Sequence, residues 1–326
     1  MLDALNIDPG PAADAIAATI RRQVLKDLRR RGVVLGLSGG VDSSVVAALC
    51  VRALGPNKVL GVLMPETDND PDSLRLGREL AQGLRIESLV EDIAPILEAA
   101  GCYRRRDEFI RRVFPDYGAG WRSKIVIRRA CGGPYNVAHL VVLPPDVENA
   151  RENAGEPREA RLPVDAYLGI VAATSMKQRT RKQIEYYHAD RLNYAVAGTP
   201  NRLEYDQGFF VKNGDGAADL KPIAHLYKSQ VYQLAAHLGV PEEIRARPPT
   251  SDTYSLAQTQ EEFYFGLPLA KLDLCVYGLD HALPAEALAP AVGLTASQVE
   301  EIYRDIAGKR RSTRYQHEPP LLVECL

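Results

Sequence analysis

Residues 38–44, Ser-Gly-Gly-Val-Asp-Ser-Ser, place two glycines beside hydroxyl and carboxylate side chains, between two apolar runs. The run before them, 33–37, is typical of a short buried strand, and 43–54 is typical of a helix. Such a turn directs backbone N–H groups at one point, where the positive end of the helix favours an anion. Asp42 would repel a bare phosphate, so its presence indicates Mg²⁺ between the carboxylate and phosphate oxygens. The alternative is an ordinary glycine turn with a helix cap.

A second group of polar residues and glycines occupies 198–228, Gly-Thr-Pro-Asn-Arg-Leu-Glu through Leu-Tyr-Lys. Four of its charged residues are Glu204, Lys212, Asp219 and Lys228. Carboxylates can hold a hard metal ion, and a metal ion with positioned lysines can neutralise charge on a transferring group. Taken alone, Lys212 and Asp219 could also be a surface ion pair.

Both segments resemble known enzymes. Ser-Gly-Gly-Val-Asp-Ser is similar to the pyrophosphate loop of the ATP pyrophosphatases, which adenylate a carboxyl, amide or similar oxygen. The stretch 198–228 resembles the second signature of the ammonia-dependent NAD synthetase family. The agreeing residues are Gly198, Thr199, Asn201, Glu204, Gly208, Phe209, Phe210, Lys212, Gly214, Asp215, Gly216, Ala218, Asp219, Pro222 and Lys228. Segments 175–187, 247–252 and 308–311 are similar to three further family motifs, so the resemblance covers roughly 12–100 and 170–315.

The resemblance implies a role for each matching position. The triphosphate would be held by Gly36, Leu37, Ser38, Gly39, Gly40, Val41, Asp42 and Ser43. Asp42 and Glu204 would hold Mg²⁺, while Thr199, Lys228 and Thr250 would contact ATP. The deamido-NAD substrate would be contacted by Arg179, Lys212, Asp219 and Lys309. The catalytic set would then be Asp42, Lys212, Asp219 and Lys228.

The implied reaction makes an amide from a carboxylate, ATP and ammonia, with release of AMP and diphosphate. Neutral ammonia must be the nucleophile, so we hypothesise that Asp219 desolvates or deprotonates ammonium. Ammonia would come free or from a separate glutaminase. Three alternatives stay open: a related ligase acting on a different carboxylate in a specialised pathway, an RNA-modifying ATP pyrophosphatase, and an inactive binding or scaffolding protein.

Composition narrows the class of protein. The chain has 326 residues and a formal net charge of −2, which argues against a nucleic-acid binder. Its five cysteines show no metal-binding or disulfide spacing, so we expect reduced thiols and a cytoplasmic protein. No apolar run approaches the length that spans a membrane. The family resemblance implies a homodimer.

The site residues need a scaffold, and the sequence predicts one. Helical periodicity at 12–31, 43–54, 71–84, 175–193 and 227–239 alternates with strand-like runs at 33–37, 58–65, 86–93 and 194–199. This alternation predicts an α/β fold, a doubly wound parallel sheet of about five strands, with nucleotide at the carboxyl ends of the strands. Beyond residue 250 the segments look short and interrupted by proline. We expect a single domain over 1–326.

The chain departs from the family pattern in two ways. An irregular insert at about 103–165 contains two strand-like pieces around a Gly-Gly-Pro turn, then a charged stretch typical of a mobile surface loop. It could be a solvated elaboration, a lid over the acyl substrate, or a dock for a phosphate-rich ligand or another protein. Ser175, Lys182 and Gly308 also replace the family's Asn, Met and His. Arg179 and Arg181 lie two apart on a predicted helix, so we expect only one of them to meet substrate.

Overall fold

A computed structural model describes residues 2–129, 136–145, 157–250 and 253–324. Its centre is a parallel sheet of β3 (Glu87–Val90), β2 (Val59–Leu63), β1 (Val33–Gly36) and β7 (Ala195–Val196), in that order. The predicted α/β class is therefore confirmed. The sheet has four strands in the described residues rather than about five, because the fifth position holds only an isolated bridge between Ala197 and Leu220.

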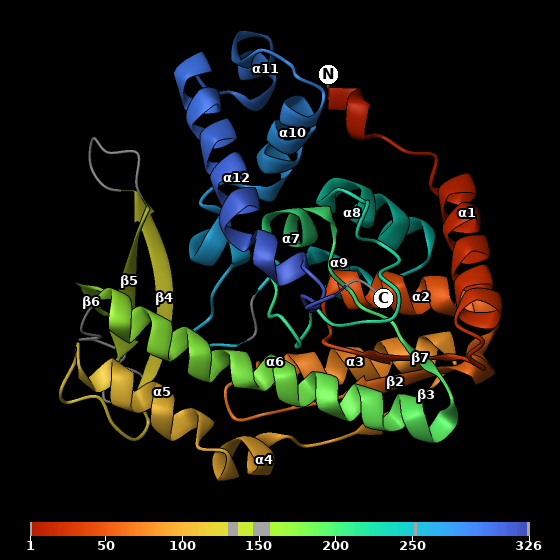
Figure 1. The fold of residues 1–326 in the computed structure, drawn as a ribbon, viewed down its shortest axis with the longest axis horizontal. Helices are drawn as coiled ribbons and strands as arrows, with labels where there is room; N and C mark the ends of the chain where they lie inside the picture. The colour runs from red at the N-terminus through yellow and green to blue at the C-terminus, as the bar shows by residue number, and fades with distance from the viewer. Residues whose placement is uncertain (1, 130–135, 146–156, 251–252, 325–326) are drawn as a thin grey trace.

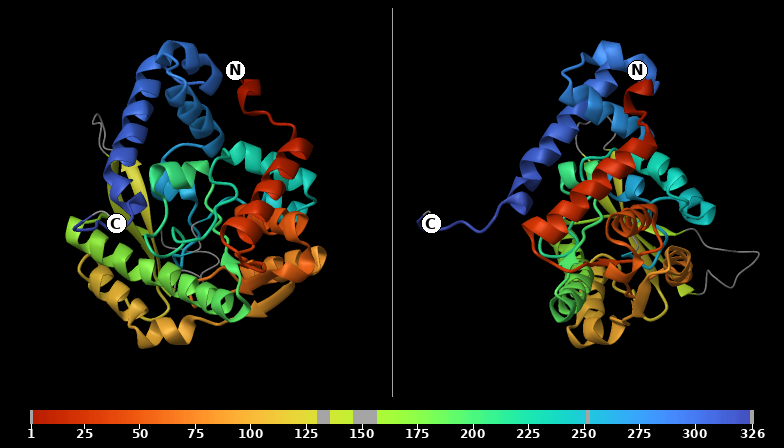
Figure 2. Two further views of the ribbon diagram at one scale, coloured as in Figure 1. Left: turned by 45° about the vertical axis from the view of Figure 1, so that its right-hand side comes forward. Right: turned by 90° about the vertical axis from the view of Figure 1, so that its right-hand side faces the viewer.

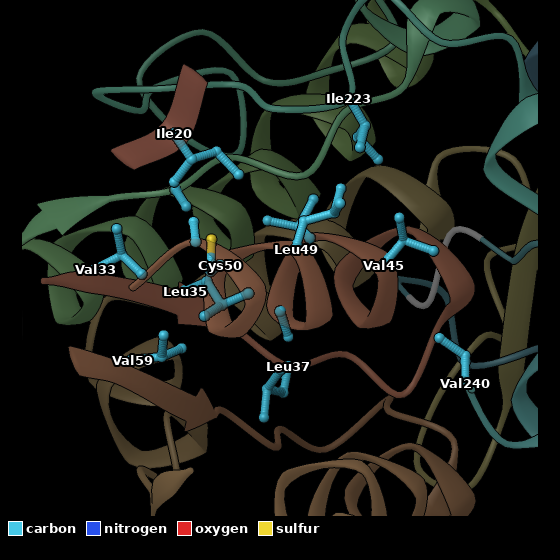
Figure 3. Close-up of a cluster of buried hydrophobic side chains, with 14 of the residues drawn as sticks. Ile20, Val33, Leu35, Leu37, Val45, Leu49, Cys50, Val59, Ile223 and Val240 are labelled. Carbon is cyan, nitrogen blue, oxygen red and sulfur yellow. The ribbon is translucent and has the colours of Figure 1, made fainter. Parts of the chain in front are cut away.

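Helices cover the sheet on both faces (Figures 1 and 2). The helices in the first half of the chain are α1 (Pro9–Arg22), α2 (Val41–Leu54), α3 (Pro71–Leu84), α4 (Ala94–Ala99) and α5 (Cys102–Arg111). Aliphatic side chains of β1 and β2 pack with those of α1, α2 and α8 (Lys228–His237) in the core on one face of the sheet (Figure 3). Val33, Leu35 and Leu49 are fully buried there, as apolar strand and helix patterns require.

A single long helix, α6 (Val164–Leu192), runs from the insert to the parallel sheet (Figure 1). It was expected only from residue 175, but it starts directly after Pro163 and continues for 29 residues. Proline favours a helix start because its fixed φ suits the first turn and it has no N–H to satisfy. Ala166 packs against the core of the insert, whereas Ala189 packs against Val34 and Val196 of the sheet.

The second half of the chain is more helical than its sequence suggested. After α6 come α7 (Arg202–Gln207), α8 (Lys228–His237), α9 (Glu242–Ala246), α10 (Leu269–Asp280), α11 (Ala285–Val292) and α12 (Ala296–His317). The expectation of short interrupted segments beyond residue 250 is wrong for α12, which has 22 residues. Thr295 starts this helix with a capping box, its hydroxyl accepting from Gln298 N while the Gln298 side chain accepts from Thr295 N.

The insert is not irregular in its described part. β4 (Arg122–Arg129), β5 (Asn136–Leu143) and β6 (Arg158–Arg161) form a separate antiparallel sheet in the order β4-β5-β6. The two strand-like pieces are thus confirmed as the β4–β5 pair. The Gly-Gly-Pro turn and most of the charged stretch lie outside the described residues.

Candidate active site

A cavity of about 950 Å³ opens at the carboxyl ends of β1, β2 and β7. In the order β3-β2-β1-β7, β2 and β3 follow on one side of β1 and β7 lies on its other side, so the topological switch point is between β1 and β7. Open α/β sheets bind ligands at this point. This volume lies at the upper end of the usual range for ligand cavities, so more than one small molecule fits. The lining includes these residues from the sequence analysis: Gly36, Leu37, Ser38, Gly40, Val41, Asp42, Ser43, Arg179, Thr199, Glu204, Lys212, Lys228 and Thr250.

The turn before α2 has the geometry of an anion cradle. Gly39 adopts φ +73°, and a Cβ on it would lie 2.7 Å from the carbonyl oxygen of Ser73. Gly40 is the N-cap of α2 and has no side chain to cap the helix, so the first-turn N–H groups face the cavity edge. The Ser38 and Ser43 hydroxyls lie 3.0 Å apart and Ser43 Oγ donates to Gly40 O at 3.1 Å, which fixes the turn.

Two carboxylates and one lysine meet beside this turn. Lys228 Nζ donates to Oδ2 of Asp42, and the Lys228 side chain is almost fully buried. Asn201 Nδ2 donates to the other Asp42 oxygen, Oδ1, at 3.2 Å. Glu204 accepts from Asn201 N at 3.0 Å and from Gln260 Nε2 at 2.8 Å. Asn201 therefore joins the two carboxylates, and it also starts α7 with a capping box to Glu204.

The electrostatics of this cluster favour a bound cation. Burial and the neighbouring Asp42 charge raise the pKa of Glu204 to about 7, while Lys228 only partly offsets them. Burial lowers the pKa of Lys228, but Asp42 and Glu204 outweigh it and leave the pKa raised. When Glu204 is ionised, two carboxylates against one ammonium leave the group one negative charge in excess, and Mg²⁺ commonly takes one or two carboxylates plus substrate phosphates. Among the described residues, no group of three or more Asp, Glu, His or Cys could by itself hold a metal ion.

Lys212 reaches the cavity from the loop after α7 and is held by the end of α12. Its Nζ donates to the carbonyl oxygens of Tyr315, at 2.7 Å, and Glu318, at 3.1 Å. Arg179 Nε donates to the carbonyl oxygen of Lys212 at 3.3 Å. The negative end of the α12 dipole thus attracts the Lys212 ammonium at the rim of the cavity.

The structure places two nominated residues elsewhere. Asp219 is not in the cavity lining, and its carboxylate accepts from Val196 N at 2.7 Å and from the Tyr186 hydroxyl at 3.3 Å. It therefore helps to secure β7, and its action on ammonium stays a hypothesis that these contacts do not test. Lys309 Nζ pairs with Asp305 at 2.8 Å and donates to Tyr264 O at 3.0 Å, behind the cavity wall.

Two arginines of α6 reach the cavity, and the expectation that only one of them meets substrate stays a prediction. Both Arg179 and Arg181 line the cavity, since long side chains can bend toward it from different faces of the helix. Arg181 donates to the Asn69 side chain at 2.9 Å, in the loop after β2. Gly39 of the nominated loop residues does not itself contact the cavity and acts through its backbone conformation.

Sequence reasoning missed a buried ion pair in the cavity wall. Lys182 Nζ donates to Glu185 Oε2 at 2.6 Å, and both side chains are 7% exposed. The only sequence signal was their i,i+3 spacing on one helix. A Cβ on Gly36 would lie 2.9 Å from Glu185 Oε1, so this pair needs glycine at the end of β1.

A second buried network lies directly behind the cavity. Lys177 Nζ donates to Glu66 Oε1 at 3.1 Å, Asp68 Oδ2 at 2.6 Å and Thr253 O at 2.9 Å. Arg106 of α5 donates to the same Asp68 oxygen. The network thereby ties α5 and α6 to the loop after β2, and no pattern in the sequence indicated it.

Comparison with known proteins agrees with this geometry. The family model "NAD synthase" matches residues 13–111 and 163–320. A curated relative, the NH(3)-dependent NAD(+) synthetase of Rhizobium meliloti (strain 1021), is 62% identical over 323 residues, which is 99% of this chain and 94% of the relative. The unmatched segment, 112–162, contains β4, β5 and β6.

Solved structures share the fold. NMN synthetase from Francisella tularensis superposes with a TM-score of 0.64 at 21% identity, over 97% of this chain and 99% of that one. An NH3-dependent NAD synthetase from Campylobacter jejuni gives a TM-score of 0.61 at 23% identity, over 98% and 100%. At these identities the structural similarity shows the fold alone, whereas the family model and the 62% identical relative show the family. The family model and this relative show that the chain, whose glycine turn, carboxylate pair and buried lysine meet at the edge of the sheet, belongs to the NAD synthase family.

Proposed function

We propose that this chain joins ammonia to the carboxylate of deamido-NAD, with ATP cleaved to AMP and diphosphate, to form NAD. The observation that carries the proposal is the Asp42–Lys228–Glu204 cluster beside the glycine turn. Its carboxylates would bind Mg²⁺ and its ammonium would bind phosphate oxygens, so the cluster is complementary in charge to a magnesium-bound triphosphate. The cavity also has room for a second substrate. The name of the 62% identical relative supports the same substrates.

Different residues of the site would bind the phosphates, neutralise their charge and hold the metal ion. The turn at 38–43 and the first N–H groups of α2 bind the phosphates, and Lys228 neutralises charge on them. Asp42 and Glu204 would hold Mg²⁺, which when bound supplies Lewis-acid stabilisation of the phosphate charge. The acyl substrate's oxygen attacks the α-phosphorus and diphosphate leaves. Ammonia then attacks the acyl carbon and AMP leaves. The third proton of the ammonia passes to solvent, and the amide keeps the other two.

Arg179 and Lys212 are positioned to orient the second substrate. Both line the cavity, and they are joined through the Lys212 carbonyl. Cations at this rim suit the phosphates of a dinucleotide. Asp219 and Lys309 are not proposed as direct contacts, because their bonds direct them away from the cavity.

The test is direct. Purified protein is incubated with ATP, MgCl2, ammonium and deamido-NAD, and AMP and NAD are measured by chromatography. Equal amounts of AMP and NAD are expected. ATP binding without NAD formation would remove the substrate assignment and leave the nucleotide site.

A different carboxylate is the second candidate, favoured by one observation. Lys182 and Ser175, where the family pattern has Met and Asn, both line the cavity, and Lys182 forms a buried ion pair there. A wall altered in this way could accept another acid. The same assay with the acid that corresponds to NMN, in place of deamido-NAD, separates the two candidates.

We also propose a homodimer in the cytoplasm. Apolar side chains of α6, Val164, Leu168 and Tyr187, are exposed and would suit a second copy. The described cysteines, Cys50, Cys102 and Cys275, are buried and free, as expected for a reducing compartment. No described helix combines the length and apolar character that crossing a bilayer demands. Light scattering on the purified chain tests the dimer.

A further inference from the structure

The antiparallel sheet in the segment that the family model does not match has an unusual neighbour. In the order β4-β5-β6, β4 has one side without a partner strand, so its N–H and C=O groups need other partners. Those partners come from residues 253–264, which we name the wall segment. It follows α9 in the chain and faces the cavity with Thr253, Tyr254, Gln260, Phe263 and Tyr264.

The wall segment contacts three consecutive residues of β4, at positions 123–125. Ser123 N donates to Ser255 Oγ at 2.9 Å, and Leu256 N donates to Ser123 O at 3.2 Å. Lys124 Nζ donates to Ala257 O and to Glu262 Oε2, each at 3.2 Å. The Gln258 side chain donates to Ile125 O and is 3% exposed. The wall segment therefore covers the first part of the open side of β4.

Apolar packing joins the same two elements. Tyr254 belongs to the buried core of the inserted sheet, with Ile125 and Leu140, and Phe263 packs against that core. Both aromatic side chains also line the cavity. One face of each ring thus supports the insert while the residue contributes to the site.

The wall segment also reaches the carboxylate pair. Gln260 Nε2 donates to Glu204 Oε1 at 2.8 Å, and the Gln260 N–H donates to Pro249 O at 3.1 Å, next to Thr250. The Thr253 carbonyl accepts from the buried Lys177 at 2.9 Å. The position of Gln260 is thereby set from two sides, by β4 and by the network behind the cavity.

We infer that the inserted sheet is a positioning device for the nucleotide site, in which Ser123, Lys124 and Ile125 hold the wall segment so that Gln260 orients Glu204. The inference rests on the proposed function only in naming ATP and Mg²⁺ as the ligands. The three alternatives given for the insert, a solvated elaboration, a lid over the acyl substrate and a dock, stay predictions beside it. Lys124 and Ser255 act through Gln260, so they are positioning residues.

The experiment removes three of these contacts with two substitutions, at residues that do not line the cavity. Lys124→Met with Ser255→Ala deletes the bonds to Ala257, Glu262 and Ser123 N. The matched control is Arg128→Met on the same strand, since Arg128 pairs with Glu159 of β6 at 3.0 Å, inside the inserted sheet. Deletion of the whole insert is a poorer test, because it would expose Ala166 and Ile170 of α6.

Amide hydrogen exchange of the wall segment and calorimetric binding of ATP with MgCl2 are the two readouts. For the double variant we expect exchange at 253–264 to accelerate and the Kd for ATP to rise about tenfold, equivalent to about 1.4 kcal/mol. We also expect a higher KM for ATP with little change in kcat, and partial rescue by Lys124→Arg. Arg128→Met should leave both readouts at wild-type values.

A double-mutant cycle with Gln260→Leu tests whether the effect on ATP binding is transmitted through Gln260. If the sheet acts through Gln260, the double variant weakens ATP binding far less in the Gln260→Leu background than in the wild type. Faster exchange without weaker binding, unchanged exchange, or equal weakening by Arg128→Met would each overturn the inference. Wild-type protein that binds ATP but makes no NAD would instead refute the proposed function and leave this inference standing.

Discussion

Lys228 and Asp42 form a buried ion pair across 186 positions of sequence, joining the first turn of α8 to the first turn of α2. Both side chains begin near helix N-termini, where anions are stabilised and cations are not. Lys228 is retained there because Asp42 and Glu204 outweigh the cost of its burial. We therefore interpret Lys228 as a residue that binds a ligand rather than one that stabilises the fold.

Replacing Lys228 by methionine tests that statement. The substitution leaves two half-buried carboxylates without their ammonium, so we expect kcat to fall by at least about 100-fold. Folding stability should also fall, because a buried ion pair broken on one side costs several kcal/mol. Chromatographic assay of AMP and urea unfolding measure the two effects. Lys58→Met, on an exposed lysine, is the control and should change neither.

Gly39→Ala should disable the phosphate turn. A Cβ there meets the Ser73 carbonyl at 2.7 Å, and the residue's φ of +73° costs a non-glycine residue about 1–2 kcal/mol. We expect calorimetry to show loss of ATP binding while the circular dichroism spectrum is kept. Gly83→Ala in α3 is the matched control, since its Cβ finds no described atom within 4 Å. Unimpaired binding by Gly39→Ala would contradict the role of the turn.

Asp219→Asn should retain most activity. An asparagine oxygen can still accept from Val196 N, and the Tyr186 hydroxyl can turn to accept from the amide. We expect kcat/KM for ammonium to stay within about threefold of wild type between pH 7 and 9. Asp219→Ala, which leaves Val196 N without its acceptor, should lose about 1–3 kcal/mol of stability. A selective loss of activity by the asparagine variant would restore the ammonium-activating role.

Lys177→Met should be strongly destabilising. Lys177 and Glu66 side chains are fully buried, and Asp68 is nearly so, hence the substitution leaves carboxylates without their ammonium. Breaking a buried pair on one side costs about 3–5 kcal/mol, although Arg106 still reaches Asp68. Urea unfolding midpoints measure the loss. Lys26→Met, on an exposed lysine, should unfold like the wild type.

The fold was predictable where the signal is local. Buried strands such as 33–36 are runs of branched aliphatic residues, and the turn after them is marked by its glycines. In the insert, alternating apolar residues revealed β4 and β5. β6, Arg-Glu-Ala-Arg, gave no signal because its pairing with β5, not its composition, makes it a strand. α12 was missed because the prolines before it obscured a helix that Thr295 then caps.

Parts of the site depend on contacts that sequence spacing does not encode. Asp219 has the residue type of a general base, but only the position of β7 shows that its carboxylate faces the backbone. Gln260 carries no motif, and its approach to Glu204 requires the inserted sheet. Asp42 and Lys228 belong to recognisable motifs, so the resemblance indicated both, while their direct bond emerged from the fold.

The continuity of α6 has a thermal consequence. A helix of 29 residues is about 43 Å long, and it carries Ala166 and Ile170 in one hydrophobic cluster and Ala189 in another. Neither hydrophobic cluster can unfold without exposing part of α6, and the other cluster also packs against that helix. Differential scanning calorimetry should therefore record one cooperative heat-absorption peak, and two resolved peaks would mean that the inserted sheet melts as an independent unit.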